Sequence, residues 1–104
     1  MIIEQIRYYF LQDRRDEIIQ ARREVTRVRR TVGIPPGHIL VADPAPDEGP
    51  TLVWQCGYAD ESELGAADAT LIGNAEYEAA RERLNALVTR VELELYMTDE
   101  EDST

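Results

Sequence analysis

The feature that most constrains the fold of this chain is the order in which strand-like and helix-like segments follow one another. Residues 2–10 are rich in β-branched and aromatic side chains, whereas apolar residues recur at helical spacing across 13–31. Two short apolar runs, 38–42 and 51–58, come next, and a second helical region leads to a strictly alternating strand at 90–97. This order predicts an α+β fold: a ferredoxin-like βαββαβ sandwich with a four-stranded antiparallel sheet and two helices on one face.

The second helical region carries two start signals. Asp60 followed by Glu63 resembles a capping box, and Asn74 directly after Gly73 resembles a second N-cap. We therefore expect this region to break into two pieces at Gly73. The short polar loop at 43–50 predicts that the two strands beside it pair as an antiparallel hairpin.

Size and charge narrow the class of protein. A chain of 104 residues is expected to form one domain, residues 1–98, followed by a disordered acidic tail at 99–104. The net charge of −10 argues against partners such as nucleic acid or an anionic membrane, because both require a basic surface. The opening residues lack the features of a signal peptide and Cys56 is the only cysteine, which predicts a cytoplasmic location. No spacing typical of a metal or cofactor site is present, so none is predicted.

The last strand has one apolar and one polar side. Val91, Leu93 and Leu95 are expected to pack against the helices, which leaves the polar side on an open face of the sheet. Because the first strand lies beside the last in this fold, Arg7 should lie across from Glu92 or Glu94. An uncovered face on so small a domain predicts a homodimer. The expected dimer interface comprises Gln5, Arg7, Tyr9, Gln55, Glu92, Glu94 and Tyr96.

Three segments spread over nearly the whole chain carry a resemblance to a known family. They are Glu4-Gln5-Ile6-Arg7-Tyr8-Tyr9, Leu52-Val53-Trp54-Gln55-Cys56-Gly57-Tyr58 and Asn74-Ala75-Glu76-Tyr77-Glu78. These segments resemble the NIPSNAP family within the dimeric α+β barrel superfamily, although Ala75 stands where such families often have Pro and Tyr77 where Trp is frequent. The resemblance implies a homodimer. The superfamily also holds cofactor-free monooxygenases, haem-degrading enzymes, polyketide cyclases and stress-responsive proteins, so the fold by itself selects no reaction.

Aromatic residues indicate a pocket between the sheet and the helices. Trp54 and Tyr58 share one face of their strand, and Tyr8 and Tyr77 are expected nearby. Such a pocket suits a small apolar or aromatic ligand. The expected ligand contacts are Trp54, Tyr58, Tyr77 and Leu40. The alternative is that these side chains simply fill the core of a small domain.

Two residues are candidates for proton transfer. His38, the only histidine, opens the second predicted strand, and a neutral imidazole can act as a general base. If the protein is an enzyme, His38 or Tyr8 is the expected catalytic residue; the alternative for His38 is an ordinary surface position at a strand end. The arginines of the first helix are interspersed with carboxylates and are expected to form a solvated face.

Three functions are compatible with these features. The first is a dimeric small-molecule-binding protein, suggested by the aromatic pocket and by the lack of a recognisable catalytic set. The second is a cofactor-independent monooxygenase or cyclase that acts on an aromatic or polyketide-like substrate. The third is a structural module that only binds a protein partner.

Overall fold

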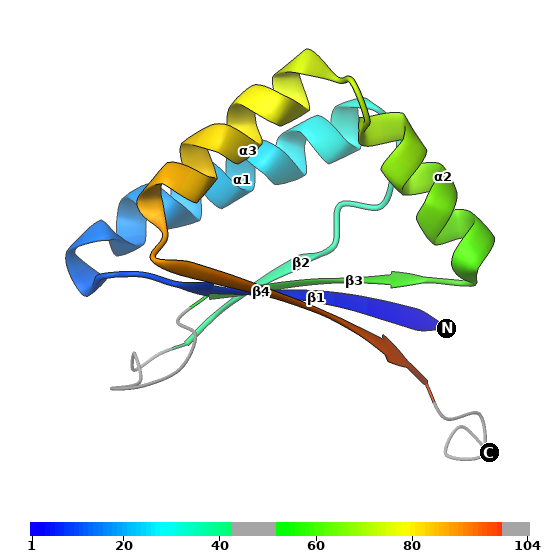
Figure 1. The fold of residues 1–104 in the computed structure, drawn as a ribbon, viewed down its shortest axis with the longest axis horizontal. Coiled ribbons are helices and arrows are strands. Elements are labelled where there is room, and N and C mark those ends of the chain that lie inside the picture. Colours follow the sequence, from blue (N-terminus) through cyan, green and yellow to red (C-terminus); the bar gives the residue numbers. More distant parts are fainter. Residues whose placement is uncertain (43–51, 99–104) are drawn as a thin grey trace.

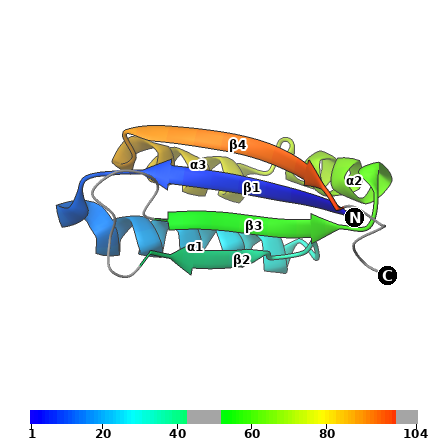
Figure 2. The same ribbon diagram turned by 90° about the horizontal axis from the view of Figure 1, so that it is seen from below.

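A computed structural model describes residues 1–42 and 52–98 of the chain. The elements in chain order are β1 (Ile2–Tyr9), the 3-10 helix η1 (Gln12–Arg14), α1 (Arg15–Thr31), β2 (His38–Val41), β3 (Leu52–Tyr58), α2 (Glu61–Leu71), α3 (Ala75–Leu87) and β4 (Arg90–Met97). The strands form one antiparallel sheet in the order β2-β3-β1-β4, and the helices lie together on one side of it (Figures 1 and 2). The predicted ferredoxin-like α+β fold is confirmed. The loop at 43–50 and the tail at 99–104 lie outside the described residues.

The helix starts follow the predicted caps. The Asp60 carboxylate accepts a hydrogen bond from the Glu63 amide at 2.9 Å, and the Asn74 side chain accepts one from the Tyr77 amide at 2.9 Å. Gly73 adopts a φ of +77°, a left-handed conformation that glycine takes without strain and that ends α2. The break predicted at Gly73 is therefore confirmed, and it turns the chain from α2 into α3 (Figure 1).

Strand register decides which side chains face the helices. Trp54 of β3 lies between Ile6 of β1 and Ile39 of β2, and side chains paired in this way point to the same face. The even-numbered residues of β1 and β3 consequently face the helices, where they meet Ile18 and Leu84 in the core. The largest fully buried side chains are Trp54, Tyr58, Ile18, Leu52, Leu84 and Val28.

The outer strand β4 differs from the expectation. Val91, Leu93 and Leu95 lie on the helix side of the sheet, as predicted, but they are 43%, 56% and 52% exposed. The prediction that the helices bury them is therefore wrong. The reason is that β4 is an edge strand, and the helices leave its apolar side largely uncovered.

Candidate functional site

A cavity of about 470 Å³ lies between the sheet and the helices. Its lining comes from β1, β3, β4 and all three α-helices, and it combines aromatic with charged side chains. The aromatic members are Tyr8, Trp54 and Tyr77. The charged members are Glu4, Arg22, Arg29, Asp68 and Arg81. A concave space that combines aromatic side chains with a few converging polar groups is the usual form of a small-molecule site.

Trp54 is the fixed wall of the cavity. Its indole Nε1 donates a hydrogen bond to the Pro36 carbonyl oxygen at 2.9 Å, which orients a ring that is only 1% exposed. Gly37 makes this possible, because a Cβ there would lie 2.5 Å from the indole nitrogen. Its φ of +71° also favours glycine.

Two arginines of α1 reach into the interior over this ring. The guanidinium carbons of Arg22 and Arg29 lie 4.4 Å and 4.7 Å from the centre of the Trp54 ring, a cation–π geometry. Both residues are almost fully buried. The expectation of a solvated arginine face is right for Arg23 and wrong for these two.

The sequence held a signal for the buried pair. Arg22 and Arg29 alternate with Ile18 and Val25 at spacings of four and three residues, which places all four on one stripe of the helix. Ile18 and Val25 are buried with them. Charged residues within an apolar helical stripe were therefore the sequence signal for the site. This signal is hard to recognise because the same helix carries several other arginines at exposed positions.

Arg29, Tyr58 and Glu4 form a chain of hydrogen bonds at one end of the cavity. Arg29 donates to the Pro35 carbonyl oxygen at 2.8 Å and to the Tyr58 hydroxyl at 2.7 Å, and that hydroxyl donates to the Glu4 carboxylate at 3.3 Å. Burial and the nearby Asp68 charge raise the pKa of Glu4 above its ordinary value of 4.5. Glu4 is thus a cavity carboxyl group that binds a proton more tightly than an ordinary glutamate does.

Tyr8, one of the two predicted proton carriers, lines the cavity. It is buried, and this burial raises the pKa of its phenol above 10.0. Tyr8 therefore stays protonated near neutral pH and can donate a hydrogen bond into the cavity, but it does not act there as a base.

The other predicted site residues separate into three groups. Trp54 and Tyr77 line the cavity. Tyr58 does not line it, but its hydroxyl is hydrogen-bonded to Arg29 and Glu4, which do. Leu40 and His38 do not line it. Leu40 pairs with Val53 and His38 pairs with Gln55, both on the open face of the sheet. The expected position of Leu40 in the pocket is therefore wrong. His38 lies on the opposite side of the sheet from a ligand bound beside Trp54. Strand alternation explains the difference, since Ile39 rather than its neighbours faces the helices.

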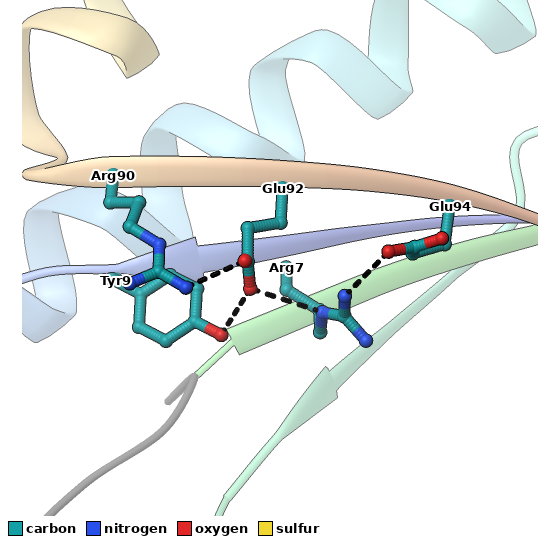
Figure 3. A network of polar contacts seen from close by, with 5 residues as sticks. All are labelled: Arg7, Tyr9, Arg90, Glu92 and Glu94. Atoms are coloured by element: carbon teal, nitrogen blue, oxygen red, sulfur yellow. Dashed lines mark hydrogen bonds and ion pairs between the residues drawn. The ribbon is translucent and has the colours of Figure 1, made fainter.

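The predicted open face carries a polar network. Arg7 lies 3.5 Å from Glu92 and 3.2 Å from Glu94, which confirms the predicted pairing, and Arg90 contacts Glu92 at 2.6 Å (Figure 3). Tyr9 also donates a hydrogen bond to Glu92. This bond and the Arg90 contact lower the pKa of Glu92. Register places all the predicted interface residues on this face.

Residues 1–42 and 52–98 contain neither a membrane-spanning helix nor a metal-binding cluster. In these ranges, no helix combines the length and the apolar character needed to span a membrane. The same ranges contain no cluster of three or more His, Cys, Asp or Glu side chains that could hold a metal ion.

Several solved structures share this fold. A NIPSNAP domain protein from Burkholderia xenovorans superposes with a TM-score of 0.74 at 17% identity, over 95% of both chains. A NIPSNAP family protein from Agrobacterium tumefaciens gives 0.71 at 19% identity, over 95% of this chain and 93% of that one. An antibiotic biosynthesis monooxygenase gives 0.68 at 13% identity, over 95% of this chain and 99% of that one.

These matches define the class by its fold. The chain has the ferredoxin-like α+β fold of the dimeric α+β barrel proteins. The resemblance to NIPSNAP proteins seen in the sequence agrees with its structural neighbours, which include NIPSNAP proteins and a monooxygenase. No protein-family model matches the sequence, and no curated protein matches it either.

Proposed function

We propose that this protein binds a small molecule in the cavity between its sheet and its helices, and that it works as a homodimer. The observation that carries the binding proposal is the cavity of about 470 Å³ beside the immobilised Trp54 ring. A domain of this size normally fills its interior, so retained space lined by aromatic and charged groups supports binding over a purely structural role.

The proposed ligand contacts are Trp54 and Tyr77, with Tyr8 as a hydrogen-bond donor and Tyr58 as support for Glu4 and Arg29. The ligand is a small molecule with an aromatic or apolar body, because Ile6, Leu84 and Leu93 line the space beyond the charged groups. Leu40 and His38 are left out of this role since they lie on the opposite face of the sheet.

Binding can be tested with a panel of aromatic acids, amides, phenols and quinones. Trp54 is the only tryptophan, so a bound molecule should change the intrinsic fluorescence directly, and it should also raise the melting temperature. The matched control is Trp54→Phe, which retains an aromatic wall and removes the fluorescence signal. A panel that changes neither fluorescence nor melting temperature would refute the proposal.

A second candidate function is a cofactor-independent monooxygenase or cyclase. The observation in its favour is the raised pKa of Glu4 beside the Tyr58 hydroxyl, because such a carboxylate can take a proton from an acidic C–H or O–H group of a bound substrate. The fold shared with an antibiotic biosynthesis monooxygenase supports an enzymatic function by analogy. Turnover that is lost in Glu4→Gln while ligand affinity is kept would distinguish the enzyme from a binder.

The homodimer is supported by two uncovered surfaces. One is the open face of the sheet, which carries the Arg7 and Glu92 network (Figure 3). The other is the helix side of β4, where Val91, Leu93, Leu95 and Met97 are 43% to 74% exposed. Apolar surface of this kind on a small domain commonly packs against a second copy.

Sedimentation should give about twice the chain mass of 11.8 kDa. Arg7→Ala should weaken the dimer if the open face is the interface, because Glu92 and Glu94 would then be buried without this partner. Arg23→Ala is the control, since it removes the same charge from an exposed helical position. A dimer equally stable in both variants would place the interface elsewhere.

The proposed location is the cytoplasm. Cys56 is free and buried, which suits a reducing compartment but does not require one.

A further inference from the structure

The buried guanidinium of Arg22 has no hydrogen-bond or ion-pair partner within residues 1–42 and 52–98. Its Nε atom is buried and has no hydrogen-bond acceptor within the described part of the chain, and none of the ion pairs found there includes Arg22. The residue is only 2% exposed and lines the cavity. Native proteins rarely bury a charge without compensation, so the missing partner needs an explanation.

Arg29, at the same site, is hydrogen-bonded to the protein. It donates to Pro35 and Tyr58. Arg22 stacks on the same Trp54 ring but makes no such bonds to the part of the chain that the structure describes. Stacking on the ring occupies the face of a guanidinium and leaves its N–H groups free in the plane. Arg22 is thus held on the cavity wall, with its Nε unpaired among the described residues.

The charges around Arg22 also favour an incoming anion. The lining contains Arg22, Arg29 and Arg81 against Glu4 and Asp68, inside a chain whose overall charge is −10. Burial lowers the pKa of Arg22, and repulsion by Arg29 adds to that effect. Glu4 attracts Arg22, but this effect on the pKa of Arg22 is weaker than the repulsion by Arg29.

We propose that the cavity selects ligands bearing a single carboxylate, which Arg22 binds through its free N–H groups beside the Trp54 ring. A carboxylate matches the planar fork of a guanidinium and accepts two parallel hydrogen bonds. Glu4 and Asp68 disfavour a second negative charge, which argues for a monoacid rather than a phosphate dianion. The apolar body of the acid then lies along Ile6, Leu84 and Leu93. This inference rests on the proposed binding function.

The test compares 3-phenylpropanoate with 3-phenylpropanamide, which have the same body and differ in charge. Calorimetric titration of the full chain at neutral pH should show the acid binding at least about tenfold more tightly than the amide. In Arg22→Gln this preference should disappear, with acid affinity falling about tenfold and amide affinity nearly unchanged. Arg23→Gln, an equal charge change at an exposed position on the same helix, should keep the preference.

Each other outcome is decisive. Equal binding of acid and amide by the unmodified chain, or a preference that survives in Arg22→Gln, would overturn the carboxylate assignment while leaving the proposed binding function intact. Binding of neither probe, together with a silent wider panel, would overturn both. If inorganic phosphate displaces 3-phenylpropanoate at equal concentration, the cavity accepts oxyanions in general and the monoacid proposal is wrong. Should Arg22→Gln fold poorly, Arg22→Met serves as the second charge-free variant with the same expected loss of preference.

Discussion

Replacing Arg22 by methionine should stabilise the protein. In the free protein the guanidinium is 2% exposed, has no ion-pair partner in the described residues and lies near the charge of Arg29. A methionine of similar length fills the same space with an apolar, flexible side chain and leaves Trp54 in place.

The magnitude follows from two opposing contributions. Replacing buried ion pairs by well-packed apolar side chains stabilises proteins by up to about 1–4 kcal/mol, and we take the same range for the buried charge of Arg22. The lost stacking on Trp54, at 4.4 Å, removes about 1–2 kcal/mol in a desolvated setting. The two ranges together span a net loss of about 1 kcal/mol to a net gain of about 3 kcal/mol, and their midpoints give a gain of about 1 kcal/mol. Each kcal/mol corresponds to about 4–8 °C in melting temperature for a domain of this size.

Urea denaturation and thermal melting of the two proteins at equal concentration measure this difference. Arg23→Met is the control, because it makes the same substitution at an exposed position of α1 and should change stability by less than about 0.5 kcal/mol. A loss of more than about 1 kcal/mol in Arg22→Met would refute the reasoning, since it would mean that Arg22 is well compensated in the free protein. A gain in stability together with a loss of carboxylate binding would show a residue retained for function at the expense of stability.

Three further changes test other parts of the structure. Gly37→Ala should destabilise the protein by about 2–4 kcal/mol, because the added Cβ would lie 2.5 Å from the Trp54 indole and the backbone there is left-handed. Gly65→Ala in α2, where a Cβ meets no other atom within 4 Å, should instead stabilise it by about 0.5–1 kcal/mol. Chemical denaturation of both variants measures the difference. Asp60→Ala should cost about 1 kcal/mol of stability through loss of the cap on α2, and an unchanged denaturation midpoint would contradict that role. Because the pKa of Glu4 is raised in the folded protein, stability should fall as the pH rises from 4.5 through that folded-state pKa. In a pH series of melting curves, Glu4→Gln should remove this fall. Parallel pH dependences of the melting temperature for the two proteins would contradict the raised pKa.

Local sequence signals were sufficient for most of the fold. The caps at Asp60 and Asn74 depend on side chains and amides three residues apart, so both could be located without any tertiary information. Strand alternation predicted the open face and the pairing of Arg7 with Glu92 and Glu94, because the fold places β1 beside β4. Leu40 was misplaced because a four-residue strand without clear alternation does not show which of its sides is buried.

The candidate site depended on packing between distant elements. Arg22 and Arg29 were visible as charges on an apolar helical stripe, but their meeting with Trp54 required β3 to lie beneath α1. Likewise, Glu4 obtains its raised pKa from burial and from Asp68, which is far away in the sequence. The sequence by itself thus determined the order, the caps and the faces of the elements, since these depend on local periodicity and short-range hydrogen bonds. Only the tertiary structure decided which charged side chains are buried together, because burial and partnership are properties of packed neighbours rather than of any one segment.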